Sequence, residues 1–379
     1  MMVRINAKGR ERTTRRSIGL ALCSLLVLLA PGGCDKASTA RPEAATTPET
    51  QPSASAGAEA ASASKKANDA VDPQRAKTLI WGTIADNPTE AADKAGEWTR
   101  FLEYVVDNLG SYGIEDSKLV FCHSPGEMAD WMRDGKVDLF DESPFAAYLV
   151  NQIGHVDEPL LNRWKNGNEK FGSVIFASAK GGIDSLDDLL GKMVVFRGDT
   201  STTQYFLPKA FLVEKGYTLV EKNKPSDPVG ANEVGYYFAW SSRDKQVEDV
   251  MDGLAAAGGN SDEFVEQLLG HTGKRGGSAR HPRKGTPQAQ KSDLRIIARV
   301  PGVLRRLVTV RKDLDPELKD ALKQMMLHMH ETPEGRAVLA TFGPASRFTV
   351  ADTPKVAYAG ISDKGALVEA EVEKFSKLR

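Results

Sequence analysis

Apolar runs alternate with helical stripes along residues 77–345, and this alternation predicts the fold. Short apolar runs bounded by turn residues predict buried strands, whereas apolar residues recurring every three or four positions predict amphipathic helices. The predicted strands lie at 79–84, 119–122, 136–140, 173–177, 193–196, 294–300 and 307–310. Strands and helices that alternate at this spacing predict an α/β protein with mainly parallel sheets flanked by helices.

The predicted helices fill the stretches between these strands. Trp98, Phe101 and Val105 form an apolar stripe, which predicts a helix that ends at Gly110. Further helices are expected around 128–132, after Ser185, after the turn at 200–203, at 245–254 and through most of 316–339. No internal repeat is visible.

Residues 1–33 have the layout of an export signal and are not expected to belong to the folded domain. Basic residues precede an apolar run at 18–30, which is too short for a transmembrane helix of roughly 20 residues. Small residues before Cys34 resemble the bacterial lipoprotein signal, in which the cysteine is lipidated and becomes the first mature residue. Residues 14–18 also resemble a twin-arginine signal, and an uncleaved membrane anchor is the alternative.

The composition then divides the remaining chain. Residues 34–76 are mainly Ala, Ser, Thr, Pro and Glu, which cannot form a core, so they are predicted to be a disordered tether. The rest is long enough for two lobes: 77–179 is assigned to lobe 1, 180–299 to lobe 2, and 300–379 to lobe 1 again. A basic, glycine-rich stretch at 270–292 is expected to be a solvated loop within lobe 2.

Charge and cysteine content argue against a nucleic-acid-binding protein and against a disulfide-rich protein. Residues 1–33 carry six basic residues and Glu11, a net charge of +5, so the total of −1 leaves −6 for the remainder. An acidic exported protein is not expected to bind nucleic acid. Cys23 lies in the signal, so apart from Cys34 only Cys122 remains, and it is expected to be a strand residue without a disulfide.

Motifs typical of catalysis and metal binding are missing. The sequence has no GxSxG, HExxH or CxxC motif. The stretch at 270–274 resembles the end of a P-loop, but Leu268 replaces its first glycine and Arg275 its final hydroxyl residue. His328 and His330 are two positions apart on a predicted helix and therefore point to different sides. We expect neither enzyme activity nor a metal or cofactor.

The stretch RGDTSTTQYFLP at 197–208 is the strongest candidate for a binding site. Four consecutive hydroxyl residues lie between a predicted strand and a predicted helix: Thr200, Ser201, Thr202 and Thr203. A helix N-terminus presents unpaired N–H groups and partial positive charge, and hydroxyl groups add donors for the oxygens of an anion. In open α/β sheets, ligands bind at the carboxyl ends of strands, where this turn lies. A simple helix cap is the alternative.

Four segments resemble the phosphate/phosphite/phosphonate-binding proteins of ABC transporters. They are LIWGTIADNPTEA, GKVDLFDESPFAAYLV, FGSVIFASAKGGIDSLDDLLGKMVVFRGDTSTTQYFLP and LVTVRKDLDPELKDAL. The resemblance implies a two-lobed periplasmic-binding-protein type II fold, in which a hinge lets the lobes close over the ligand. It also implies that Ser201, Thr202 and Thr203 hold phosphonate-like oxygens.

The resemblance extends to other pocket residues, several of which differ from the family. Arg243 stands where the family has a ligand-contacting His, and Arg306 lies in a stretch where the family has an Asp. An acidic position falls near Asp262 or Glu263, and Ser143 precedes a helix where the family usually has an aromatic residue or Gly. The two Arg residues favour a more fully anionic ligand than an aminoalkyl phosphonate. Salt bridges at the surface or between the lobes are the alternative for both.

These observations predict a lipid-tethered solute-binding protein that acts as a monomer in the periplasm or at the cell surface. It would capture a small phosphorus oxyanion by hinge closure and deliver it to a membrane permease and its ATPase. The alternative is a ligand-sensing protein that presents its closed form to a membrane sensor kinase. An exported enzyme would need a catalytic pair in the cleft, and none is visible. Phosphate, phosphite, an alkylphosphonate and sulfate all stay open as ligands.

Overall fold

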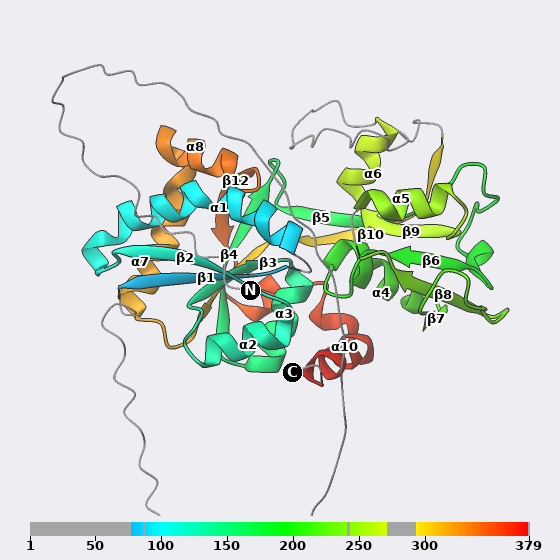
Figure 1. The fold of residues 1–379 in the computed structure, drawn as a ribbon, viewed down its shortest axis with the longest axis horizontal. Coiled ribbons are helices and arrows are strands. Elements are labelled where there is room, and N and C mark those ends of the chain that lie inside the picture. The colour runs from blue at the N-terminus through cyan, green and yellow to red at the C-terminus, as the bar shows by residue number, and fades with distance from the viewer. Residues whose placement is uncertain (1–76, 86–87, 241–242, 271–292, 378–379) are drawn as a thin grey trace, which may run out of the picture. The chain divides into compact units, whose positions relative to one another are not determined.

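The computed structural model describes residues 77–377 except 86–87, 241–242 and 271–292. It contains two six-stranded sheets with helices packed against them (Figure 1). No helix in this described part is long and apolar enough to cross a membrane. The expectations for the signal, Cys34, the tether and the basic loop fall almost entirely on residues outside it.

The first sheet is built from both ends of the described chain. Its strand order is β12-β4-β11-β3-β1-β2, and β1 lies parallel to β2 and β3. In contrast, β11 runs antiparallel to β3 and β4, and β12 runs antiparallel to β4. The strands are β1 (Thr78–Ile84), β2 (Asp116–Cys122), β3 (Leu139–Glu142), β4 (Asp157–Lys165), β11 (Leu307–Arg311) and β12 (Ala345–Val350).

The second sheet holds the central part of the chain in the order β10-β5-β9-β6-β8-β7. Strand β6 lies parallel to β8 and β9, and β7 parallel to β8, whereas β5 is antiparallel to both β9 and β10. The strands are β5 (Lys170–Ser178), β6 (Met193–Phe196), β7 (Thr218–Glu221), β8 (Glu233–Phe238), β9 (Ala257–Ser261) and β10 (Leu294–Leu304).

Both sheets are mixed instead of mainly parallel. Five of the ten strand pairings in the described part are antiparallel. The cause is the chain path: it leaves the first sheet through β4 and β5 and returns through β10 and β11, and these strands run against those of the βαβ units. The chain crosses between the two sheets at 165–170 and again at 304–307.

Helices cover both faces of each sheet (Figure 1). In the first sheet one face carries α1, α7 and α8, and the other α2 and α3; in the second sheet α4 lies on one face, and α5 and α6 on the other. The helices are α1 (Pro88–Leu109), α2 (Pro125–Arg133), α3 (Pro144–Gly154), α4 (Leu207–Glu214), α5 (Arg243–Met251), α6 (Asp262–Leu269), α7 (Pro316–His328), α8 (Pro333–Thr341), α9 (Pro354–Ala357) and α10 (Ala366–Ser376). Short 3-10 turns are η1 (Gly110–Tyr112), η2 (Asp187–Leu189), η4 (Met329–Glu331) and η5 (Ser362–Lys364), and η3 (Thr202–Phe206) is π-helical.

The end of α1 differs from the sequence-based prediction. Gly110 does not end the helical segment, because the 3-10 turn η1 continues it for another turn. Gly113 ends it instead, with a left-handed φ of 80° and an N–H that donates to the Gly110 carbonyl. Glycine adopts this conformation without the steric cost that a Cβ would bring.

Asp157, at the start of β4, is a fully buried carboxylate. Neither of its carboxylate oxygens has a hydrogen-bond partner within the described residues, although Asn151 Nδ2 donates to its backbone carbonyl at 3.0 Å. Burial raises the pKa of Asp157 to about 7, and the charges of Lys312 and Glu158 have smaller, opposite effects. The folded protein therefore favours the protonated carboxyl.

This carboxyl should make part of the stability depend on pH. Its contribution is full below its ordinary pKa of 3.8 and is lost as the pH rises through about 7. In denaturant unfolding, the free energy of unfolding of Asp157→Asn relative to wild type should increase by about 2–3 kcal/mol between pH 5 and pH 8. The exposed control Asp313→Asn should show a constant difference from the wild type. A constant difference for Asp157→Asn would contradict the prediction.

Candidate functional site

The hydroxyl turn follows β6 and starts a helix, as predicted. Ser201 Oγ accepts a hydrogen bond from the backbone N–H of Gln204 at 3.2 Å, so Ser201 caps the turn. The first turn, η3, is π-helical: the N–H of Phe206 reaches back to the carbonyl of Ser201 at 3.0 Å. Such turns are rare and often occur at functional sites. One hydroxyl is therefore used as a cap, and three others remain.

Thr202 brings two helix N-termini together. Its Oγ1 accepts a hydrogen bond at 3.0 Å from the backbone N–H of Phe145, in the first turn of α3. Ser143 is the N-cap residue of α3 but makes no side-chain capping bond. Thr202 is 1% exposed, and its hydroxyl proton is still available for donation. The positive ends of helical segments packed on different sheets thus meet at one hydroxyl.

The other two threonines differ in their surroundings. Thr203 is buried, and its backbone carbonyl accepts from Ser173 Oγ at 2.6 Å. Neither the Thr200 hydroxyl nor the Thr203 hydroxyl makes a hydrogen bond within the part of the chain that the structure describes. Both can therefore donate to an anion without breaking an internal bond.

A network of buried amides supports the turn from the side of the second sheet. Gln204 Nε2 donates to Gln246 Oε1 at 3.1 Å and to Asn260 Oδ1 at 3.0 Å. Asn260 Nδ2 also donates to Gln246 Oε1, at 2.8 Å, and Gln246 Nε2 donates to the carbonyl of Gly259 at 2.7 Å. All three side chains are buried. Sequence reasoning missed this network, because each amide is isolated in the sequence and only the fold brings them together.

The predicted acidic residues interact with the strands that cross between the sheets. Glu263 accepts from both terminal nitrogens of Arg305, at 2.6 Å each, and from Asn168 Nδ2 at 2.6 Å. Burial opposes ionisation of Glu263, but Arg305 outweighs it and lowers its pKa. Asp262 accepts from the backbone N–H of Gly172 at 3.0 Å. Both carboxylates are satisfied by protein groups at the crossing.

Arg306 belongs to a buried ion cluster. Its Nε pairs with Asp141, and its Nη2 donates to the Asp141 carbonyl at 2.6 Å. Arg163 binds the same carboxylate through Nε at 2.6 Å and Nη2 at 3.1 Å. Burial opposes the charge on Arg306, but Asp141 and Glu142 raise its pKa above the ordinary value. Arg306 therefore forms salt bridges within the protein, which was the alternative to ligand binding.

Arg243 is the first residue of α5, and its side chain lies outside the described part.

A charged cluster around Lys94, which the sequence did not predict, is linked to the stretch at 197–208 through Arg197. Lys94 Nζ donates to the Ile84 carbonyl and lies 3.4 Å from Glu90 Oε1 and 3.8 Å from Glu142 Oε1. Arg197, the first residue of the stretch at 197–208, has its Nη2 at 3.5 Å from Glu90 Oε1. In the sequence, Glu90 and Lys94 look like an ordinary surface pair one helical turn apart. Only the fold adds Glu142 and Arg197 to them.

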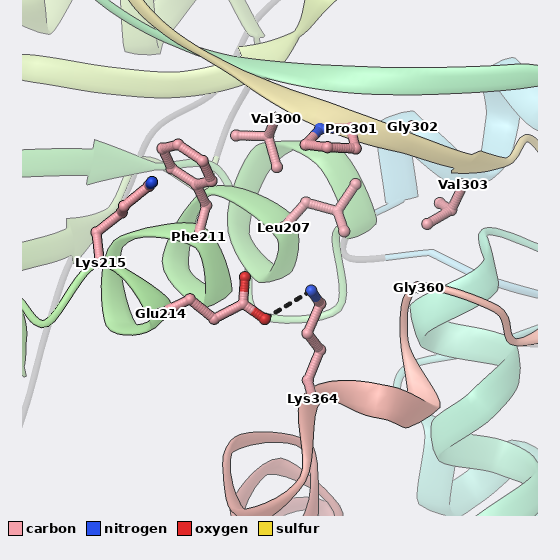
Figure 2. Close-up of a pocket in the computed structure, with 10 residues that line it drawn as sticks. All are labelled: Leu207, Phe211, Glu214, Lys215, Val300, Pro301, Gly302, Val303, Gly360 and Lys364. Carbon is pink, nitrogen blue, oxygen red and sulfur yellow. Dashed lines mark hydrogen bonds and ion pairs between the residues drawn. The ribbon is translucent and has the colours of Figure 1, made fainter.

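A pocket of about 320 Å³ lies elsewhere, among α4, β10 and the segment that leads into α10. Figure 2 shows Leu207, Phe211 and Val300 along it, and an ion pair between Glu214 and Lys364 at 2.7 Å. None of the residues predicted to bind a ligand lines this pocket. In the described part, no group of His, Cys, Asp or Glu side chains could hold a metal ion.

The family follows from a comparison of the whole chain with known protein families. The model of the family described as "ABC transporter, phosphonate, periplasmic substrate-binding protein" matches residues 84–355. This chain belongs to that family. The match includes the second sheet, the first sheet apart from most of β1, the hydroxyl turn and the two crossings. As a member of the family, the chain is a periplasmic substrate-binding protein of an ABC transporter, and the resemblance of the four segments is confirmed.

Several solved structures share the fold of this chain. XAC2383 from Xanthomonas citri, bound to ATP, has a TM-score of 0.65 and 22% identity, and the match covers 79% of this chain and 98% of that one. The methylphosphonate complex of PhnD1 from Prochlorococcus marinus has a TM-score of 0.55 and 18% identity, covering 77% and 98%. A phosphonate-transporter binding protein from Pseudomonas aeruginosa has a TM-score of 0.53 and 20% identity, covering 79% and 96%. No curated protein matches the chain.

The buried amide network of this binding protein can be tested without a ligand. Gln246→Met keeps the size of the side chain but leaves donors of Gln204 and Asn260 without their shared acceptor. Denaturant unfolding should show a loss of about 2 kcal/mol or more, because buried donors without partners are costly. The exposed control Gln324→Met should change stability by less than about 0.5 kcal/mol. Equal stability of Gln246→Met and wild type would contradict the importance of the network.

Proposed function

We propose that this binding protein is a lipid-anchored carrier that captures a small phosphorus oxyanion between its lobes and delivers it to a membrane permease. The observation that carries the proposal is the contact between Thr202 Oγ1 and the N–H of Phe145 at 3.0 Å. It brings the N-termini of η3 and α3, packed on different sheets, to one point. Unpaired N–H groups and hydroxyls at such a point suit an anion with several oxygens.

The surrounding charge supports an anionic ligand. Cations gather where the chain crosses between the sheets: Arg163 and Arg306 share one carboxylate, that of Asp141. Burial, followed by the positive charges of these two guanidinium groups, lowers the pKa of Lys165 to about 8. Cationic side chains at this crossing would favour the approach of a phosphate-like group.

The fold supplies a physical basis for capture by closure. Two chain crossings join the sheets, which allows the lobes to rotate about a hinge. An anion that accepts hydrogen bonds from the Thr202 hydroxyl and from the start of α3 would bind both lobes at once. Such a ligand stabilises the closed form in proportion to its preference for that form. No covalent step is needed, in line with a family of solute-binding proteins.

Membership of an ABC-transporter family supports delivery to a permease, and we propose lipidation at Cys34 as the means of anchoring. A tether of residues 34–76 would let the folded part move while keeping it close to its transporter. The likeness to PhnD1 from Prochlorococcus marinus in complex with methylphosphonate supports a ligand with a phosphorus centre.

A thermal-shift screen of the purified protein tests this function. We expect phosphate, phosphite or methylphosphonate to raise the melting temperature, and sulfate to have a smaller effect. A ligand that binds only the folded state adds about 2.7 kcal/mol of stability at a hundred times its dissociation constant. A melting temperature that stays constant with all three phosphorus anions would overturn the proposal.

Thr202→Ala should weaken binding of whichever of these anions raises the melting temperature. The variant removes one hydroxyl donor to the ligand, and loss of a hydrogen bond to a charged group corresponds to about tenfold or more in affinity. Thr332→Ala is a matched control, because Thr332 Oγ1 also accepts a backbone N–H, from Gly335 at 3.0 Å, but caps α8. Calorimetric titration that gives equal affinities for Thr202→Ala and Thr332→Ala would remove Thr202 from the site.

A further inference from the structure

Lys94 lies in a small cage of oxygen atoms, which we call the ammonium cage. The cage consists of the Ile84 carbonyl, Glu90 Oε1 and Glu142 Oε1. Lys94 Nζ donates to the carbonyl and lies 3.4 Å and 3.8 Å from the two carboxylate oxygens. The Lys94 side chain is only 21% exposed, and that of Glu142 only 7%. The carbonyl accepts one N–H of the ammonium group, and the two carboxylates attract its positive charge.

The fold holds the cage firmly from one side. Glu142 Oε1 accepts from Thr83 Oγ1 at 2.6 Å and from the N–H of Ile84 at 2.8 Å. These residues end β1, and Glu142 ends β3, which is the parallel neighbour of β1. The carboxylate therefore has a fixed position at the carboxyl edge of the first sheet. An ammonium group in the cage would be recognised by a preformed arrangement.

The cage borders the proposed anion site on two sides. Glu142 is followed by Ser143, the N-cap residue of α3, and the N–H of Phe145 binds Thr202. On the other side, Glu90 pairs at 3.5 Å with Arg197, which begins the hydroxyl turn. A ligand with a phosphonate on the turn and an amine on a short chain would place its ammonium group near this cage.

We propose that Lys94 occupies the position of a ligand's ammonium group and thereby selects phosphorus oxyanions that lack an amine. The inference rests on the proposed function and deepens it. Lys94 excludes an aminoalkyl phosphonate by occupying the cage and repelling its charge. It also neutralises Glu90 and Glu142, which would otherwise repel the anion. Asp262 and Glu263, which lie near the family's acidic position, bind the Gly172 N–H and Arg305.

The test compares two variants of Lys94 with wild type in calorimetric titrations. The probes are methylphosphonate, phosphate, phosphite and 2-aminoethylphosphonate. Lys94→Ala empties the cage and leaves its carboxylates in place, whereas Lys94→Met refills the space without a charge. Lys319→Ala is the matched control: the Lys319 side chain is 19% exposed and its Nζ also contacts a carboxylate, Glu158, and a carbonyl.

Wild type should bind at least one amine-free anion and bind 2-aminoethylphosphonate much more weakly. Lys94→Ala should tighten binding of 2-aminoethylphosphonate by about tenfold or more, since each charged hydrogen bond is worth that much. It should weaken binding of the amine-free anion, because Glu90 and Glu142 each lose one of their cationic partners and keep only Arg197 and Arg306. Lys94→Met should bind the amine-free anion more weakly but should not gain affinity for 2-aminoethylphosphonate. Lys319→Ala should bind both ligands as wild type does.

Two results would overturn this inference while leaving the proposed function intact. One is a wild type that binds 2-aminoethylphosphonate as tightly as the amine-free anions. The other is a Lys94→Ala variant that binds an amine-free anion but gains no affinity for 2-aminoethylphosphonate. Failure of the wild type to bind any of the four probes would overturn the proposed function, and this inference with it.

Discussion

The buried carboxylate of Asp141 holds together the region on which the rest of the structure depends. It is fully buried and binds both Arg163 on β4 and Arg306 at the return crossing. Burial opposes its charge, but the two guanidinium groups lower its pKa below the ordinary value. A buried charge of this kind is tolerated only with such partners, so β3, β4 and the crossing keep one geometry. Glu142 of the cage and the start of α3 directly follow Asp141 in the chain.

Local patterns predicted the elements that have strong periodicity. The strand at 193–196 was predicted with its observed bounds, and the helices after 98 and 316 were also recovered. β9 has the sequence AGGNS, and β4 begins with Asp-Glu-Pro, so neither shows the pattern of a strand. Both form because neighbouring strands pair with them, which is a tertiary effect.

The hydroxyl turn was predictable because its residues are consecutive, whereas its supports were not. Ser201 acts as the cap that the alternative foresaw, and Thr202 has a second role in the contact between the lobes. The pairing of Arg305 with Glu263 joins residues 42 positions apart in the sequence. No local pattern distinguishes such a pair from two residues that face a ligand, and only the folded chain shows the partner of each charge.

The C-terminal helix has a mechanical consequence. Helix α10 packs against α3, and its Glu371 binds both Tyr205 of η3 and Lys209 of α4. Lys374 adds an ion pair with Asp199 at 3.1 Å. Two crossing segments alone permit one sheet both to bend and to twist against the other, whereas a third connection away from them, helix α10, resists twisting. Because α10 contacts α3 on the first sheet and both η3 and α4 on the second, a rotation of one sheet against the other would have to preserve these contacts or break them.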